Sequence, residues 1–162
     1  MVLAHGLPVV TEVVAESMSP AIERGAKVKV APVTDELRPG DIVLVLTDDG
    51  QDLLLHRVVH LFSEGESRFV IHQGDAPKST FATCLRAAVV GRAISFPHRP
   101  SRPLPTLEHL DLASLARFQR RRRAAALYAV GHRMTESLRL GDHALTHRLA
   151  RIYRAIARKV VG

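Results

Sequence analysis

The chain has 162 residues, of which 46% are hydrophobic and 4% aromatic. This length holds one core of ordinary domain size, with or without a helical appendage, and the hydrophobic content excludes a chain that is disordered throughout. The net charge of +7 is uneven, since residues 1–98 carry 9 Lys and Arg against 12 Asp and Glu, whereas residues 99–162 carry 14 against 4. We therefore expect the two parts to face different partners.

The cellular location is predicted from what the sequence lacks. No apolar run approaches the ~20 residues of a membrane-spanning helix, and the first ten residues have neither the basic segment nor the long apolar stretch of a secretion signal. A single Cys84 excludes an internal disulfide and fits a reducing compartment. We expect a cytoplasmic protein.

From Thr11 to Phe96 the apolar residues come in short runs bounded by turn residues, a pattern typical of an all-β domain. The predicted strands cover residues 27–30, 41–46, 53–62, 68–72 and 87–96. About five or six strands at this spacing predict a mainly β fold with a barrel-like or sandwich sheet.

The rest of the chain is predicted to be helical. Residues 97–105 contain four Pro, which lack a backbone donor and favour extended neighbours, so they predict a stiff linker. Residues 107–130 and 142–161 are rich in Ala, Leu and Arg without strand alternation, and both predict helices. The predicted organisation is a β domain over 1–96, a linker over 97–105 and a basic α-helical extension over 106–162.

Residues 16–25, Glu-Ser-Met-Ser-Pro-Ala-Ile-Glu-Arg-Gly, break strand alternation, and Pro20 cannot donate to a ladder. Taken alone, these residues make Ser17 an ordinary turn residue. On the same grounds His56, in the apolar run 53–59, is a buried strand histidine, and Asp75 is a turn residue that caps its own backbone.

Five short motifs follow one another along residues 12–96. They are Ser17-Met18-x-Pro20, Pro39-Gly40-Asp41, His56-Arg57-Val58, Gly74-Asp75 and Val90-Gly91-Arg92. In this order they resemble the signal peptidase I and LexA-like superfamily of serine peptidases. Bacterial signal peptidases and LexA-like proteins place a Lys before the Arg-Val pair, whereas the endoplasmic-reticulum and SipW-like branch places a His there. With His56 at that position, the chain resembles a soluble member of the Ser/His branch.

The resemblance implies a β-barrel-like catalytic domain with Ser17 as nucleophile and His56 as general base. A serine hydroxyl attacks a carbonyl when a base accepts its proton, and a neutral imidazole does so near pH 7. Asp75 would orient His56 and stabilise the imidazolium, and the backbone N–H of Ser17 would bind the oxyanion. No cofactor and no metal is expected.

Further residues are assigned to substrate binding. Met18 and Pro20 lie beside the nucleophile and Arg57 beside the base, so we expect these three to contact the substrate. The expected substrate is a peptide or protein precursor of the same cell, from which a leader or pro-segment is removed.

The chain departs from the family pattern in two places. Many members have Ser-Gly before the nucleophile where this chain has Ala15-Glu16, and the eukaryotic branch has a later acid that residues 76–81 lack. Two alternatives therefore stay open, a Ser/His dyad with Asp75 as helper and a non-catalytic module that holds an extended peptide as an added strand. His60, predicted on the strand face of His56, is an alternative base.

The basic extension has several interpretations. The four Arg of residues 120–123 form a solvated face, or they contact an anionic membrane surface or an acidic peptide. A nucleic-acid partner is less favoured because aromatic residues for base stacking are sparse. His143 and His147 have the i, i+4 spacing of a metal site on one helix face, yet no Cys or further carboxylate is arranged to complete the site locally, so we predict no metal there.

Overall fold

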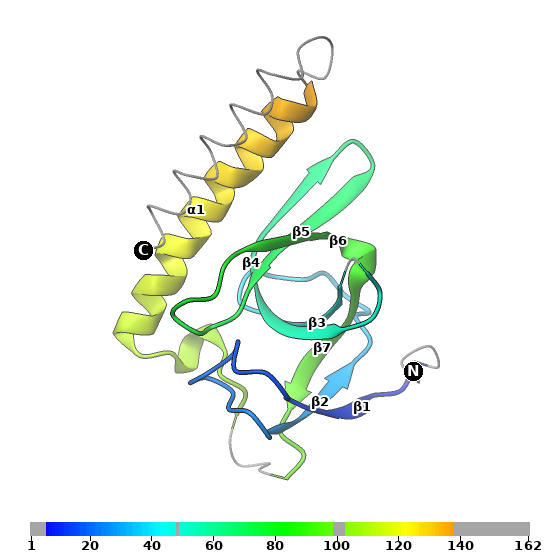
Figure 1. Cartoon of the computed structure of the whole chain (residues 1–162), viewed down its shortest axis with the longest axis vertical. Coiled ribbons are helices and arrows are strands. Elements are labelled where there is room, and N and C mark those ends of the chain that lie inside the picture. Colours follow the sequence, from blue (N-terminus) through cyan, green and yellow to red (C-terminus); the bar gives the residue numbers. More distant parts are fainter. Residues whose placement is uncertain (1–5, 48, 99–102, 138–162) are drawn as a thin grey trace. The chain divides into compact units, whose positions relative to one another are not determined.

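The computed structural model describes residues 6–47, 49–98 and 103–137 (Figure 1). The chain divides into two units, residues 1–110 and 111–162, and each is described by itself. The predicted mainly β fold with a helical extension is confirmed: an antiparallel sheet of seven strands, which does not close into a barrel, is followed by one helix in the described part of the chain.

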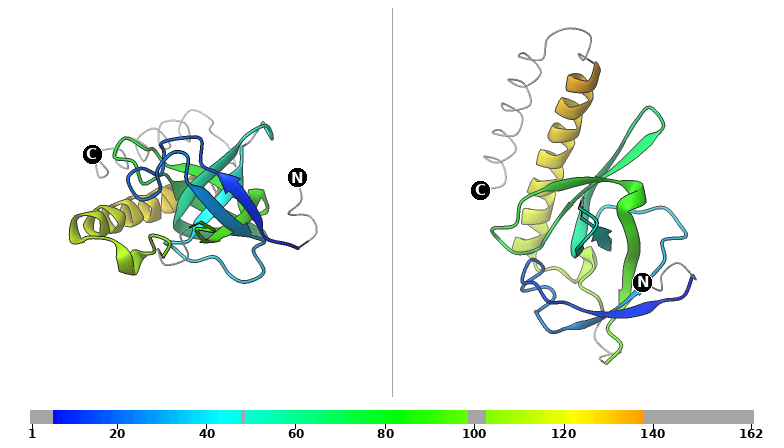
Figure 2. Two further views of the ribbon diagram at one scale, coloured as in Figure 1. Left: turned by 90° about the horizontal axis from the view of Figure 1, so that it is seen from below. Right: turned by 45° about the vertical axis from the view of Figure 1, so that its right-hand side comes forward.

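The strands are β1 Val9–Glu12, β2 Lys27–Ala31, β3 Ile42–Leu46, β4 Leu53–Glu64, β5 Ser67–Gln73, β6 Ala82–Leu85 and β7 Val89–Ser95. They lie in the order β1-β2-β7-β3-β4-β5-β6, and every neighbouring pair is antiparallel. Figure 2 shows the strong curvature of this sheet from two further directions. The last strand therefore lies near the middle of the sheet, and β1 and β6 form its edges.

All five predicted strands are present with shifted ends, and β1 and β6 are additional. Each of these two has four residues and lies at an edge, where a short strand leaves little periodicity in the sequence. The strand predicted over 87–96 begins later, at Val89, because Arg86–Ala88 forms a 3₁₀ turn.

Apolar side chains are buried on both faces of the sheet. β3 shows this directly, since Ile42 and Leu44 belong to one core cluster and Val43 and Val45 to another. The first cluster also contains Met18, Ile22, Val28, Val30, Leu55, Ala93 and Leu104, and the second Val58, Val70, Cys84 and Val89. A loop between β1 and β2 thus contributes directly to the first core.

A bulge in β4 decides which histidines share a face. Val58 pairs with His72 and His60 with Ile71, so Val59 is an extra residue with no partner on β5. Because neighbouring β5 residues point to opposite faces, His72 shares the face of Val58 and His56, whereas His60 lies on the other face. The prediction that His60 shares the face of His56 is wrong for this reason.

The second unit contains the helix α1, Leu112–Ser137. The helix begins five residues later than predicted because Asp111 caps it: the Asp111 Oδ1 atom accepts a hydrogen bond of 2.8 Å from the Ser114 N–H. Residues 107–109 form a separate 3₁₀ turn in the first unit. The helix predicted over 142–161 lies outside the described residues, and no described helix is long and apolar enough to cross a membrane.

Candidate functional site

The loop of residues 13–26 between β1 and β2 presents Ser17 and is called the Ser17 loop below. Its ends are joined by hydrogen bonds from the Val13 N–H to the Ala26 carbonyl (2.9 Å) and from the Gly25 N–H to the Val13 carbonyl (2.7 Å). Gly25 has φ +81°, which favours glycine. The buried Met18 and Ile22 anchor the loop in the first core cluster, so Ser17 is held on a fixed, half-buried backbone.

The Ser17 loop packs against the segment that follows β5. The Ala76 N–H donates a 2.9 Å hydrogen bond to the Ser17 carbonyl. A Cβ added to Gly74 would lie 2.1 Å from that same carbonyl oxygen, so no larger residue fits at position 74 with the Ser17 loop in place.

This contact brings Ser17 to the segment that contains Asp75. Gly74 and Ala76, which both contact the Ser17 carbonyl, stand on either side of Asp75, and the charge of Asp75 acts on His56. Arg57, the residue after His56, pairs with Gln73, the last residue of β5. Ser17 and Gly74, 57 positions apart in the sequence, are thus in contact next to the strand end that adjoins the His56 strand.

The polar groups of Ser17 are otherwise unengaged in the described residues. No hydrogen bond joins its hydroxyl to His56, and its backbone N–H has no acceptor there. Within the described residues, the Ser17 N–H is therefore available to a bound acceptor, and its predicted role in binding an oxyanion stays a prediction.

His56 lies on β4 and is only 8% exposed. Burial lowers the pKa of His56, and the negative charge of Asp75 partly opposes that shift. Its Nδ1 atom lies 2.9 Å from Nδ1 of His72, with the ring centroids 5.1 Å apart. Burial, together with the charge on His56, lowers the pKa of His72 to about 4, so both rings are neutral near pH 7.

Asp75 is held by Arg57. The Arg57 Nε and Nη2 atoms donate to the two carboxylate oxygens of Asp75 at 2.9 and 2.6 Å, and Nη1 donates to the Gly40 carbonyl at 2.9 Å. Arg57 is 1% exposed and the Asp75 side chain 15%. Asp75 therefore acts on His56 through its charge, and its predicted role as the group that orients His56 stays a prediction.

The motifs that are separate in the sequence contact one another in the fold. Arg57 joins the motif that contains His56 to Gly40 and to Asp75, and Ser17 contacts Gly74 and Ala76. Arg92 joins the last motif to the others, since its guanidinium lies 3.6 Å from Asp41 and 2.7 Å from Asp35.

The residues predicted to bind substrate lie in different environments. Met18 is fully buried in the first core cluster, Arg57 is bound to Asp75 and Gly40, and Pro20 is exposed. Their contact with substrate stays a prediction. His143 and His147 lie outside the described residues, within which no three His, Cys, Asp or Glu are grouped as metal ligands would be.

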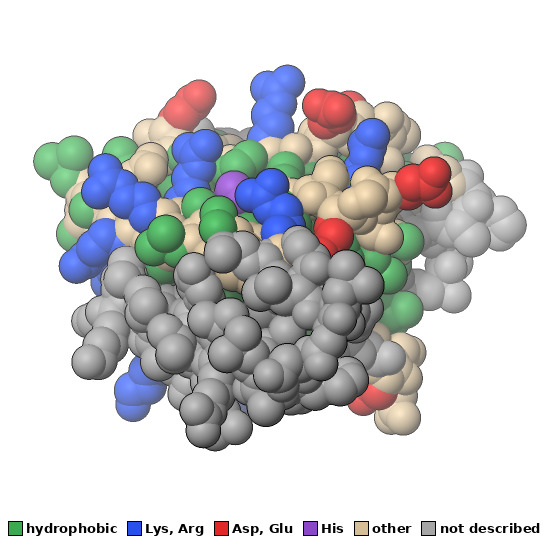
Figure 3. Space-filling model, turned by 90° about the horizontal axis from the view of Figure 1, so that it is seen from above, with side chains coloured by type: hydrophobic (Ala, Val, Ile, Leu, Met, Phe, Trp, Pro, Cys, Tyr) green, Lys and Arg blue, Asp and Glu red, His purple; other side chains and the backbone are tan. Residues whose placement is uncertain are grey.

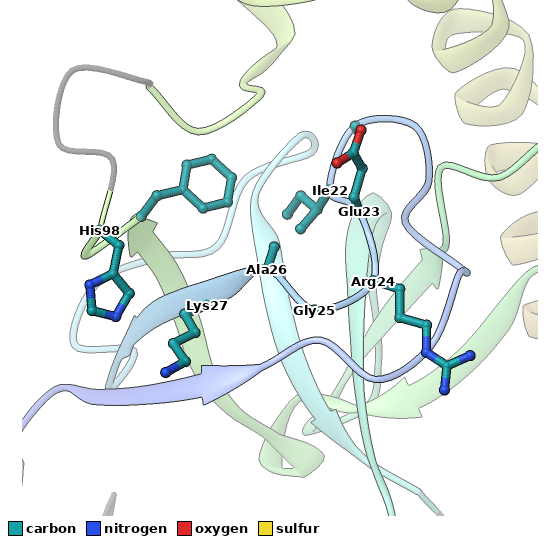
Figure 4. A pocket seen from close by; sticks show the side chains of 9 residues that line it. Ile22, Glu23, Arg24, Gly25, Ala26, Lys27 and His98 are labelled. Atoms are coloured by element: carbon teal, nitrogen blue, oxygen red, sulfur yellow. The ribbon is translucent and has the colours of Figure 1, made fainter.

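A cavity of about 380 Å³ lies beside the second half of the Ser17 loop. Figure 4 shows its lining, in which residues 21–27 face Phe96 and His98 at the end of β7. Ser17, His56 and Asp75 are not part of this lining. The cavity is therefore separate from the candidate site.

Comparison with known proteins adds no assignment. No family model matches the chain, and no curated protein or solved structure is significantly similar to it.

Proposed function

We propose that this chain is a serine endopeptidase of the signal peptidase I type that removes a leader or pro-segment from a peptide or protein precursor. Ser17 is the nucleophile and His56 the general base. The observation that carries the proposal is the packing of the Ser17 backbone against Gly74 and Ala76, on either side of Asp75, whose charge acts on His56.

The mechanism moves one proton between named atoms. The Ser17 hydroxyl attacks the scissile carbonyl while its proton passes to Nε2 of His56, and the Ser17 N–H stabilises the oxyanion. His56 then returns the proton to the leaving amine, and water hydrolyses the acyl-enzyme by the same route. The lowered pKa of His56 keeps its imidazole neutral and able to accept this proton at pH 7.

The charges around Ser17 set the expected activity. Glu16 is exposed next to Ser17, and a negative charge there opposes the developing oxyanion. Asp75 lies close enough to act on His56 and favours the imidazolium. We therefore expect a slow maturation peptidase.

A non-catalytic peptide-binding module is the second candidate. It is favoured by the absence of a hydrogen bond between Ser17 and His56 in the described residues and by the open edge of β1, where Val10 is 53% exposed. An extended peptide can add to such an edge through its main chain.

The helix α1 is the proposed recruiting element. Arg120, Arg122 and Arg123 are exposed on it, and they suit an acidic leader peptide or an anionic membrane surface. Figure 3 shows one face of the molecule, on which Lys and Arg side chains stand among apolar and a few acidic ones. We place the protein in the cytoplasm or at the inner surface of the membrane.

The test compares cleavage by the wild type with Ser17→Ala and His56→Ala. Substrates are a library of peptides with small residues before the scissile bond and co-expressed candidate precursors, with products identified by mass spectrometry. Ser19→Ala, in the same loop, and His60→Ala, on the opposite face of β4, are matched controls. Cleavage lost in the first two variants and kept in the controls supports the peptidase, whereas precursors that bind wild type and stay intact support the binding module.

A further inference from the structure

The Nδ1 atoms of His56 and His72 face each other at hydrogen-bond distance. At 2.9 Å one nitrogen must donate and the other accept, because two N–H groups or two lone pairs at this distance would repel. His72 is 2% exposed and His56 8%, so water does not readily replace either partner. The contact therefore links the tautomer of one ring to that of the other.

The proposed reaction decides the direction of this bond. If Nε2 of His56 accepts the serine proton, that nitrogen carries a lone pair beforehand, and the neutral ring keeps its own proton on Nδ1. Nδ1 of His72 is then the acceptor, and His72 carries its proton on Nε2. The imidazolium that forms on His56 donates the same bond, so no proton leaves the pair during the step.

The residue expected to orient His56 is occupied elsewhere. Both carboxylate oxygens of Asp75 accept hydrogen bonds from Arg57, and in the described residues no bond joins Asp75 to His56. His72 makes the contact that a carboxylate makes in a Ser-His-Asp triad, and Asp75 supplies negative charge at a distance.

We propose that His72 is a positioning residue of the candidate site: its Nδ1 accepts a hydrogen bond from Nδ1–H of His56 and holds that ring in the tautomer whose Nε2 accepts a proton. This inference rests on the proposed function. The β4 bulge at Val59 makes the arrangement possible, since it brings His72 opposite Val58 and onto the face of His56.

The direct test is the tautomer of His56 in the full-length chain. Histidine labelled with ¹⁵N is observed at pH 7.5 by long-range proton–nitrogen correlation, and His56 and His72 are assigned by their loss in His56→Gln and His72→Asn. We expect Nδ1–H on His56 in the wild type and in Asp75→Asn. In His72→Asn the amide oxygen takes the place of the Nδ1 acceptor and preserves this tautomer, whereas His72→Leu removes the acceptor and shifts His56 toward Nε2–H.

Kinetics supply a second readout. His72→Leu is expected to lower kcat about 10- to 100-fold with KM unchanged, a loss typical of outer partners that orient a functional histidine, and His72→Asn should restore most of it. Hydrogen exchange of the β4 and β5 amides identifies a variant that loses activity because the sheet opens.

The outcomes separate this inference from the proposed function. Nε2–H on wild-type His56, or kcat unchanged in His72→Leu, overturns the positioning role while cleavage can still depend on Ser17. A tautomer that shifts in Asp75→Asn and not in His72→Leu also overturns it. A third outcome is that no precursor is cut, while His56 carries its proton on Nδ1 in the wild type and in His72→Asn but not in His72→Leu. The proposed peptidase function is then refuted, and the hydrogen bond from His56 to residue 72 is supported.

Discussion

Replacing Gly74 with Ala tests whether the Ser17 loop lies where the structure places it. The new Cβ would stand 2.1 Å from the Ser17 carbonyl oxygen and 2.8 Å from its carbon, where contacts under 3.0 Å essentially do not occur. The Ser17 backbone must therefore retreat by about 0.9 Å. The third neighbour, the Ser79 hydroxyl oxygen at 2.8 Å, can rotate away, but the two Ser17 atoms are backbone atoms on an anchored loop, so rotation of a side chain cannot relieve their contact.

The expected losses follow from this displacement. A reacting group misplaced by about 1 Å costs on the order of 10²-fold in rate, and overpacking a close contact costs roughly 1–3 kcal/mol of stability. The hydrogen bond from the Ala76 N–H to Ser17, 2.9 Å long, should break as well. We expect Gly74→Ala to lower kcat/KM about 100-fold and to speed hydrogen exchange at the Ala76 amide.

Gly65→Ala is the matched control. Gly65 lies in the turn between β4 and β5 with φ +57°, and nothing lies within 4 Å of an added Cβ. An L-residue there costs about 1–2 kcal/mol from backbone strain. Gly65→Ala should therefore lose about as much stability as Gly74→Ala, but at the opposite end of β5 from Gly74. Wild-type kcat/KM and wild-type protection of Ala76 in Gly74→Ala would refute the packing of Ser17 against Gly74.

Stability must be followed by a probe that reports the sheet. The chain has no Trp, and its two Tyr, Tyr128 and Tyr153, both lie in the second unit, so intrinsic fluorescence does not follow the sheet. Hydrogen exchange of the strand amides is the suitable measurement for every variant of the first unit.

Three further predictions concern charge. His72 has a pKa of about 4 in the folded chain and about 6.5 when unfolded, so between these pH values the unfolded chain binds a proton that the folded chain does not. The contribution of His72 to the free energy of unfolding is therefore complete above pH 6.5 and falls by about 3 kcal/mol as the pH drops to 4. Urea titrations should find this loss reduced in His72→Asn. Asp75→Ala leaves the buried Arg57 without its carboxylate and should destabilise the sheet by about 3–5 kcal/mol. Asp35→Ala, at the exposed pair with Arg92, should cost much less, because solvent screens that pair; equal losses in urea titrations would contradict the burial difference. Binding of the wild type to anionic vesicles and to acidic leader peptides is compared at low and high salt, and the ligand that binds identifies the partner of α1. Replacing Arg120, Arg122 and Arg123 with Gln should abolish that salt-sensitive binding.

Much of the fold could be predicted because the local signals agree with the tertiary structure. Turn residues such as Pro39-Gly40 separate apolar runs whose strands all form. The start of α1 cannot be predicted from the apolar pattern, because the capping bond of Asp111 sets it. The edge strands β1 and β6 are not predictable from periodicity, because four residues give too little alternation.

The candidate site could be predicted only in part, because its key contact depends on a bulge. In a regular ladder without the bulge, the register that pairs His60 with Ile71 would pair Val59 with His72 and place His72 on the face away from His56. No feature of the sequence marks a bulge there. The pair of hydrogen bonds from Arg57 to Asp75 is likewise not predictable from the sequence, since the resemblance implies Asp75 as a partner of His56 and Arg57 as a substrate contact.

The position of β7 has a consequence for biosynthesis. Ser17 belongs to the part of the sheet made by β1 and β2, His56 belongs to the part made by β3 to β6, and β7 is the strand that joins the two parts within the sheet. A growing polypeptide emerges from the ribosome N-terminus first, so both halves of the proposed dyad are available long before Val89–Ser95 can connect them. The two residues of the proposed dyad are thus part of one continuous sheet only after β7, the last of the described strands to be made, has joined β2 to β3.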